Sequence, residues 1–418
     1  MLDLLQDLFD SCDQAGIPLV EIRPRPWVEP DIYTGDLDCL LPHAQWQDFA
    51  ALLRECCLRH RCSYLFDRTR LDKAQLWIFG PHGSENLQFD CWADLEFRAP
   101  GHPKACFLSW QTIQTHLQET DRRRFTLPLE LEAQYYLSHL GTKSRDLTYN
   151  DARQRITDYR DRLSGRWETV MQQALDGQLD ASIAEANEAL APLLSRSHRR
   201  RYSLKWHKWR SRRLRARRLY AMLGPDGCGK TAAIEILNRI QPIKIYRFKR
   251  VFRRALSYRL FLPLWRKQTA ATIGRTPEKN QIDDLKVGNL FFIGLWRAWL
   301  LAWLSPLRRR SVVCDRFFPD LLMSGSRFPG KTVTPHRHWQ RRQSLHPSPS
   351  LYLQLDADPT IILQRKQELE AQQINDLSRW YHRMAMADRS PLYAYVVNEG
   401  SLGDFRATLG SIMQKVAA

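Results

Sequence analysis

A glycine-rich turn between an apolar strand and an amphipathic helix constrains this chain more than any other segment. Residues 224–231 read GPDGCGKT and fit the pattern G-x-x-x-x-G-K-[ST], with LYAML before them and the helix-like run AAIEILNRI after them. Glycines at 224, 227 and 229 let the backbone curl closely around phosphates with its amide hydrogens pointing inward. The N-terminus of the following helix adds partial positive charge. We therefore expect a phosphate-binding loop that holds a nucleoside triphosphate.

The residues of this loop have separate expected roles. Lys230 is expected to contact the β- and γ-phosphates of ATP, and the Thr231 hydroxyl to ligate Mg²⁺. The expected nucleotide-binding residues are Gly224, Pro225, Asp226, Gly227, Cys228, Gly229, Lys230 and Thr231.

The C-terminal half alternates short apolar runs with helix-compatible sequence. The runs lie at 219–224, 243–248, 311–317, 350–356 and 394–400. This alternation predicts an α/β fold with a parallel five-stranded sheet covered on both faces. The third run ends in Asp315-Arg316 rather than the Asp-Glu typical of motors and helicases. An aspartate for the metal beside an arginine for a substrate phosphate suits a small kinase.

Four stretches together resemble the thymidylate kinase-like family of P-loop kinases over residues 218–418. They are GPDGCGKT with Asp226 inside the loop, CDRFFPDLL, LYLQLDADPTIILQRKQELE, and a closing VVN strand with its helix. The resemblance implies ATP-dependent phosphoryl transfer supported by Mg²⁺. It implies that Asp226 orients the acceptor, that Asp315 supports Mg²⁺ or the acceptor, and that Arg316 grips the acceptor phosphate. Arg365 would close over the transferring group, helped by Lys366 and Arg379.

The region after the second strand departs from that family. Residues 244–267 hold nine Lys/Arg and no acid, and we can place no thymine-reading residue among them. The acceptor is therefore left as a nucleotide or another small phosphorylated or hydroxylated compound.

Three aspartates near the N-terminus form a second candidate site. Asp36 and Asp38 alternate along one predicted strand, so that both carboxylates project from the same face, and Asp90 lies on another strand. Such hard oxygen ligands suit a two-metal centre. The pattern resembles the nucleotidyltransferase fold over residues 1–125, without the Gly-Ser pair that normally precedes the first aspartate. The alternative function is thus a bifunctional protein whose second site transfers a nucleotidyl group.

Between these parts we expect a helical connector over 126–217, which leaves 1–125 and 218–418 as the two α/β domains. The connector ends in a basic segment: residues 196–218 contain twelve Lys/Arg and no acid, two thirds of the formal net charge of +18. Tyr202, Trp206 and Trp209 fall on one helical face within it. We expect that stripe to dock onto the protein. The alternatives are an anionic partner, either a nucleic acid, which would make the chain a nucleic-acid-binding P-loop protein, or a membrane surface.

The remaining features favour a cytoplasmic protein, with peripheral membrane association as the alternative. The nine cysteines form no CxxC pair and predict reduced thiols, and the N-terminus lacks a signal-type apolar run. The longest apolar stretch, 290–304, contains Arg297 and is short for a membrane span. We expect it to be a buried helix with Trp296, Trp299 and Trp303 in the core.

Overall fold

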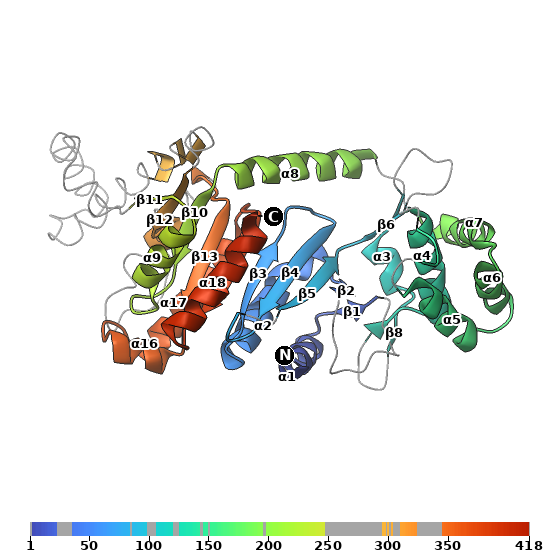
Figure 1. Ribbon diagram of the computed structural model, residues 1–418, viewed down its shortest axis with the longest axis horizontal. Helices are drawn as coiled ribbons and strands as arrows, with labels where there is room; N and C mark the ends of the chain where they lie inside the picture. The colour runs from blue at the N-terminus through green and yellow to red at the C-terminus, as the bar shows by residue number, and fades with distance from the viewer. Residues whose placement is uncertain are drawn as a thin grey trace, which may run out of the picture. The chain divides into compact units, whose positions relative to one another are not determined.

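The computed structural model describes residues 2–22, 36–83, 86–97, 106–119, 125–142, 145–148, 151–194, 198–246, 295–297, 299–300, 302–303, 310–323 and 345–417. The protein is a mixed α/β protein whose β-sheet is mixed and, in the C-terminal part, mostly parallel (Figure 1). Contacts divide the chain into two compact units, residues 1–52, 70–76 and 87–208, and residues 53–69, 77–86 and 209–418. Two short segments of the N-terminal half therefore belong with the C-terminal half.

The first unit combines a small group of strands with a helical bundle. Its strands are β1 (Val20–Glu21), β2 (Asp36–Leu40), β5 (Asn86–Trp92), β6 (Leu95–Phe97), β7 (Cys106–Leu108), β8 (Gln118–Glu119) and β9 (Phe125–Thr126), and β4 (Lys73–Phe79) begins in it. Its helices are α1 (Leu2–Gln14), the start of α2 (Trp46–Arg59), α3 (Trp110–Gln114), α4 (Leu129–Thr142), α5 (Ala152–Arg162), α6 (Arg166–Leu175), α7 (Leu179–Leu190) and the first half of α8 (His198–Ala216).

The helical bundle contains a break within the expected helical region. Residues 151–175 form two helices, because α5 ends at Arg162 and α6 begins at Arg166. Gly165 between them has φ +66°, a left-handed conformation that a continuous helix cannot contain. The two helices then share one apolar core, which includes Ile156, Tyr159 and Trp167.

The second unit is built on five parallel strands in the order β11-β12-β10-β13-β14. They are β11 (Ile243–Tyr246), β12 (Ser311–Asp315), β10 (Leu219–Leu223), β13 (Leu351–Asp356) and β14 (Leu392–Val397). The helices are α9 (Lys230–Ile240), α14 (Phe318–Leu322), α16 (Pro359–Arg365), α17 (Ala371–Ala387) and α18 (Leu402–Ala417). The expected parallel sheet of five strands is found.

Both faces of this sheet are covered, as its alternating side chains require. Leu353 and Leu355 of β13 belong to the apolar core that α9 and α18 complete, and these two helices lie side by side in Figure 1. The intervening Gln354 faces α17, since its amide donates to the Ser378 carbonyl at 2.9 Å. Period-two alternation along one strand thus serves two different helix layers.

A sixth strand, β3 (Ser63–Asp67), was not predicted. It pairs antiparallel with β14, so the outer edge of the parallel sheet is closed by residues more than 300 positions upstream. Arg54 of α2 anchors the same segment, because its Nη2 donates to Asp356 Oδ2 at 3.0 Å and to Ser378 Oγ at 2.9 Å, with both partners buried. The C-terminal unit therefore contains a piece of the N-terminal half as part of its core.

Within the described part of the chain, no helix is both long and apolar enough to cross a membrane. The eight cysteines whose side chains are described are free and buried, in agreement with the prediction of reduced thiols. The apolar stretch 290–304 is described at seven positions, all helical. The prediction that its tryptophans lie in the core is wrong for Trp296 and Trp303, which are 39% and 59% exposed.

Candidate nucleotide-binding site

The phosphate loop lies where the strand order of the parallel sheet reverses. It leaves the carboxyl end of β10, which lies between β12 and β13, and leads directly into α9 (Figure 1). In open parallel sheets, ligands bind at the carboxyl edge at this kind of position. The sequence therefore brings the loop to the edge of the sheet where a ligand is expected.

Three glycines give the loop its curvature. Gly224, Gly227 and Gly229 have φ values of +135°, +98° and +101°, which residues with a side chain rarely adopt. Neighbouring groups also exclude a Cβ: at Gly224 it would lie 2.4 Å from the Leu355 carbonyl oxygen, and at Gly229 2.2 Å from Asn398 Nδ2. The loop backbone is thus held close to β13 and β14, and only glycine fits at these two positions.

The Lys230 side chain folds back over the loop. Its Nζ donates to the carbonyl oxygens of Gly224 and Pro225, both at 2.7 Å, and to Asp226 Oδ1 at 3.1 Å. Lys230 also begins α9, and Gly229 caps that helix in a left-handed conformation without a side-chain acceptor. The ammonium group therefore lies beside the amide-rich turn, where a phosphate would gain from both.

Asp226 and Arg316 form the charged centre of the site. Arg316 Nη2 donates to both carboxylate oxygens of Asp226, at 2.8 and 2.9 Å, and Lys366 Nζ lies 3.7 Å from Oδ2. Burial would raise the pKa of Asp226, but Lys230 and Arg316 outweigh it and hold that pKa well below its usual range. Asp226 is therefore ionised at neutral pH.

Arg316 also reaches a second carboxylate, from Asp320 on α14. Its Nη1 lies 3.6 Å from Asp320 Oδ1, which also accepts from the Tyr381 hydroxyl at 3.2 Å. Burial raises the pKa of Asp320 to about 6, although Arg316 opposes the shift. Arg316 itself has φ +91°, an unusual backbone conformation for a residue with a long side chain. The arginine is thus fixed in place by two acids.

Thr231 and Asp315, the expected metal-binding pair, lie at the same edge of the sheet. Thr231 is the second residue of α9 and is exposed, and Asp315 is the last residue of β12, paired in register with Met222 of β10. A hydroxyl and a carboxylate are oxygen donors of the kind that Mg²⁺ prefers, so the donor set fits that ion.

Two of the three expected lid cations lie beside the loop. Arg365 ends α16, and its Nη1 donates to the Asn398 carbonyl at 3.1 Å, while Lys366 pairs with Glu368 at 2.9 Å in addition to its contact with Asp226. The ion pair of Arg379 is with Glu55 of α2, at 3.2 Å. The structure thus associates Arg365 and Lys366 with the loop and Arg379 with the segment that carries β3.

Sequence reasoning missed Asn398. Its side-chain Nδ2 donates to the Cys228 carbonyl at 2.9 Å, and its backbone N–H donates to the Asp356 carbonyl at 2.8 Å. Asn398 therefore fastens the loop to the ends of β13 and β14. The signal was present: Asn398 directly follows β14 in the run AYVVNEG, at the carboxyl edge where polar side chains approach a ligand.

The N-terminal aspartates lie on neighbouring strands of the first unit. β2 and β5 are parallel, and Asp38 is the register partner of Asp90, while Asp36 is opposite Gln88. Asp90 forms an ion pair with Lys73 and accepts from Gln75 at 3.2 Å. Among the described residues, no three His, Cys, Asp or Glu side chains are grouped closely enough to hold a metal. The strand register thus brings Asp38 and Asp90 opposite each other, but Lys73 neutralises the Asp90 carboxylate.

The basic segment forms α8, and its aromatic stripe is exposed. Tyr202, Trp206 and Trp209 are 75%, 58% and 50% exposed. The expectation that this stripe docks onto the protein is therefore wrong for the described residues. Most of the cationic stretch 244–267 lies outside them, so the expectations about the acceptor region stay predictions.

No protein-family model and no curated protein matches this chain.

Proposed function

We propose that this protein is a cytoplasmic ATP-dependent phosphotransferase of the thymidylate kinase-like type, acting on a nucleotide or another small phosphorylated or hydroxylated acceptor. The observation that supports this most strongly is the loop from Gly224 to Thr231. Its three left-handed glycines, its lysine and its helix N-terminus converge at the carboxyl edge of a parallel sheet.

In the proposed reaction, an acceptor oxygen attacks the γ-phosphorus in line. The new P–O bond forms as the bond to the bridging oxygen of ADP breaks, and the acceptor proton is released. Lys230 would move from the loop carbonyls to the β- and γ-phosphates and offset the charge that builds up on them. Bound Mg²⁺, held by Thr231 and Asp315, would add charge neutralisation at the same oxygens.

Asp226 and Arg316 are suited to the acceptor side of the reaction. Arg316 is held by Asp226 and Asp320, so its guanidinium needs little further ordering to bind a phosphate. Arg365, whose Nη1 donates to the Asn398 carbonyl, would be the lid cation that closes over the transferring group. Arg316 and Lys366 both lie within 4 Å of the Asp226 carboxylate.

The test is transfer of ³²P from γ-labelled ATP, screened over nucleoside monophosphates, nucleosides and sugar or lipid-linked alcohols. Lys230→Ala is expected to lower the rate by about 10²-fold or more, since one positioned donor contributes that much. Arg239→Ala is the matched control, because it removes an exposed cation from the same helix, α9. Full activity of Lys230→Ala, or equal losses in both variants, would reject the proposal.

The register of Asp38 with Asp90 favours a second candidate, nucleotidyl transfer in the first unit. ATP labelled in its adenine ring separates the two reactions. Label that becomes attached to an acceptor and is lost in Asp38→Asn, but not in Lys230→Ala, would require the second site. If the adenine label stays in ATP, ADP or AMP while ³²P is transferred to the acceptor, only the kinase reaction is supported.

A further inference from the structure

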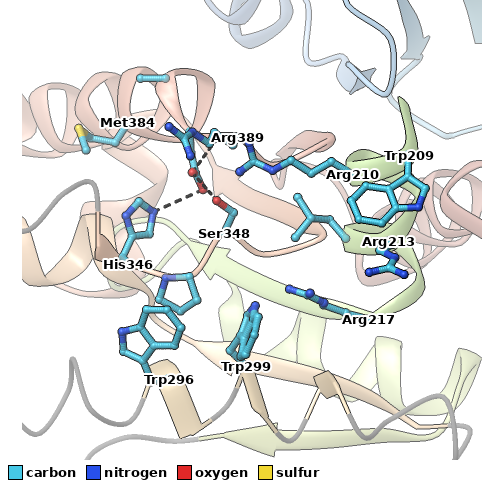
Figure 2. Close-up of a pocket in the computed structure, with 14 residues that line it drawn as sticks. Trp209, Arg210, Arg213, Arg217, Trp296, Trp299, His346, Ser348, Met384 and Arg389 are labelled. Carbon is cyan, nitrogen blue, oxygen red and sulfur yellow. Dashed lines mark hydrogen bonds and ion pairs between the residues drawn. The ribbon is translucent and has the colours of Figure 1, made fainter. Parts of the chain in front are cut away.

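A cavity of about 640 Å³ lies at the end of the second unit's sheet opposite to the phosphate loop (Figure 2). Its lining includes Arg217, just before β10, Ser348, just before β13, and Arg389, just before β14. All three strands are parallel, so these residues share the amino-terminal edge. The loop at Gly224 leaves the carboxyl end of β10, which makes the cavity a separate place.

The lining carries a strong excess of positive charge. Four arginines contribute, namely Arg210, Arg213 and Arg217 from α8 and the residues that follow it, and Arg389 after α17. The one carboxylate among the lining residues is Asp388, whose Oδ1 accepts from Ser348 Oγ at 2.9 Å and whose Oδ2 lies 3.4 Å from His346 Nε2. Burial would raise the pKa of Asp388, but His346, Tyr352 and Ser348 lower it. One ionised acid therefore stands against four guanidinium groups.

The arginines stand close enough to repel one another. Burial lowers the pKa of Arg210, and the charge of Arg389 lowers it further. Burial and Arg213 do the same to the pKa of Arg217. Both shifts disfavour the charged forms, and an anion bound between these groups would favour them.

Aromatic rings provide the other half of the lining. The Arg213 guanidinium lies over the ring of Trp209 at 4.0 Å, and that of Arg217 lies over the ring of Trp299 at 4.4 Å. Trp296 meets Trp299 edge-on at 5.5 Å. Figure 2 shows the indoles of Trp296 and Trp299 on one side of the arginines and that of Trp209 on another. Planar surfaces thus flank the positive charge.

We propose that this cavity binds a nucleotide, with its phosphates among the four arginines and its base against the exposed indole of Trp296, since guanidinium groups lie over the rings of Trp209 and Trp299. Guanidinium groups are matched to phosphate oxygens, and indoles to the face of a base. The volume falls within the range of about 300–1,000 Å³ that is usual for small-molecule sites. A space of that size accommodates a single nucleotide, and the test below distinguishes it from a nucleic acid strand.

The test is calorimetric titration with ADP on the full chain carrying Lys230→Ala, which weakens the phosphate loop and leaves the cavity intact. In that background, Arg210→Gln/Arg217→Gln is expected to weaken ADP binding at least tenfold. Arg212→Gln, an exposed arginine on the same helix that does not line the cavity, should change it by less than twofold. Arg389→Gln, at the exposed rim, gives a second variant if the double substitution impairs folding.

Two further probes examine the class of ligand. Pyrophosphate should bind at least tenfold more weakly than ADP, because it offers no base to the indoles. ADP affinity that is indifferent to every cavity substitution would overturn the proposal, as would equal affinity for pyrophosphate. It would also fall if a single-stranded RNA 12-mer bound tenfold more tightly than ADP and lost that binding with the same substitutions. None of these results depends on whether the protein transfers a phosphoryl group.

Discussion

Arg316 donates from one nitrogen, Nη2, to both carboxylate oxygens of Asp226, at 2.8 and 2.9 Å, and so ties the end of β12 to the interior of the phosphate loop. The same guanidinium approaches Asp320 through Nη1 at 3.6 Å. Asp226 and Asp320 thus share one arginine, but their environments differ. Asp226 is also beside Lys230, whereas Asp320 is deeply buried against Tyr381.

Substitutions of the two acids should therefore change the free energy of unfolding with opposite dependences on pH. The folded-state pKa of Asp320 is raised to about 6, so the wild type gains stability as pH falls from 7 towards 4, where the folded state binds the extra proton. Asp320→Asn lacks that gain, and its destabilisation relative to wild type should grow by on the order of 1–3 kcal/mol between pH 7 and pH 4.5. Urea unfolding at the two pH values measures it. A cost that shrinks at low pH would show that the carboxyl of Asp320 is ionised throughout.

Asp226→Asn should show the reverse dependence. The folded-state pKa of Asp226 is lowered, so its ion pairs stabilise the protein above the unfolded-state pKa near 4, and that contribution is lost as pH falls through the acid range. The destabilisation caused by Asp226→Asn should be largest at pH 6–7 and smaller at pH 3. The same unfolding series gives the answer, and a cost that is constant over this range would rule out a charged role for Asp226.

Gly229→Ala should destroy the phosphate loop. The new Cβ would lie 2.2 Å from Asn398 Nδ2 at a φ of +101°, so both the contact and the backbone conformation oppose it. We expect a loss of roughly 2–4 kcal/mol of stability, together with loss of ATP binding. Thermal unfolding with and without ATP measures both effects.

Gly410→Ala is the matched control for that substitution. Gly410 lies within α18 and shows no positive φ, and a Cβ added there would meet no neighbouring atom within 4 Å. Alanine at this position should be neutral or stabilise the protein by up to about 1 kcal/mol, because it favours the helix. Asn398→Ala combined with Gly229→Ala removes the close contact but not the strain, so it should recover only part of the stability.

How far the sequence could predict this fold depends on the range of each interaction. The strand before Gly224 and the helix after it are specified locally, by an apolar run, a glycine turn and an amphipathic repeat. The break at Gly165 is also local, yet a glycine inside a helical pattern is often tolerated, so the pattern alone does not reveal it. The strand at Ser63–Asp67 joins the parallel strands through its pairing with β14, a contact between distant residues that no local pattern records.

The candidate site likewise combines residues that a local motif marks with residues that only the tertiary structure brings together. Lys230 and Thr231 are marked by one contiguous motif, whereas Asn398 reaches the loop from the end of another strand. The burial of aromatic stripes was harder to predict, because Trp206 on α8 has the spacing of a core residue and is 58% exposed. Periodicity defines a face of a helix, and only the tertiary structure determines what that face contacts.

Arg54→Ala should destabilise the second unit strongly. Asp356 would keep its hydrogen bonds from Tyr395 and Ser378 but lose the only cation that is paired with it among the described contacts. Breaking a buried ion pair on one side costs about 3–5 kcal/mol. Arg59→Ala, an exposed position on the same helix, should cost less than about 0.5 kcal/mol. Equal urea midpoints for the two variants would show that Arg54 is dispensable.

The Lys73 ammonium forms an ion pair with Asp90 and lies 4.6 Å from the centre of the Trp92 ring. Lys73→Met leaves a largely buried carboxylate without its cation, so it should destabilise the protein by about 1–3 kcal/mol. Lys73→Met/Asp90→Asn should recover most of that loss, because neither partner is then an isolated charge.

The same pair of variants tests the predicted metal site at Asp38 and Asp90. If Asp38 and Asp90 bind a divalent ion in competition with Lys73, then Mn²⁺ should raise the melting temperature of Lys73→Met more than that of wild type, and not that of the double variant. Identical shifts in all three proteins would mean that Lys73 neutralises Asp90 for structural reasons alone.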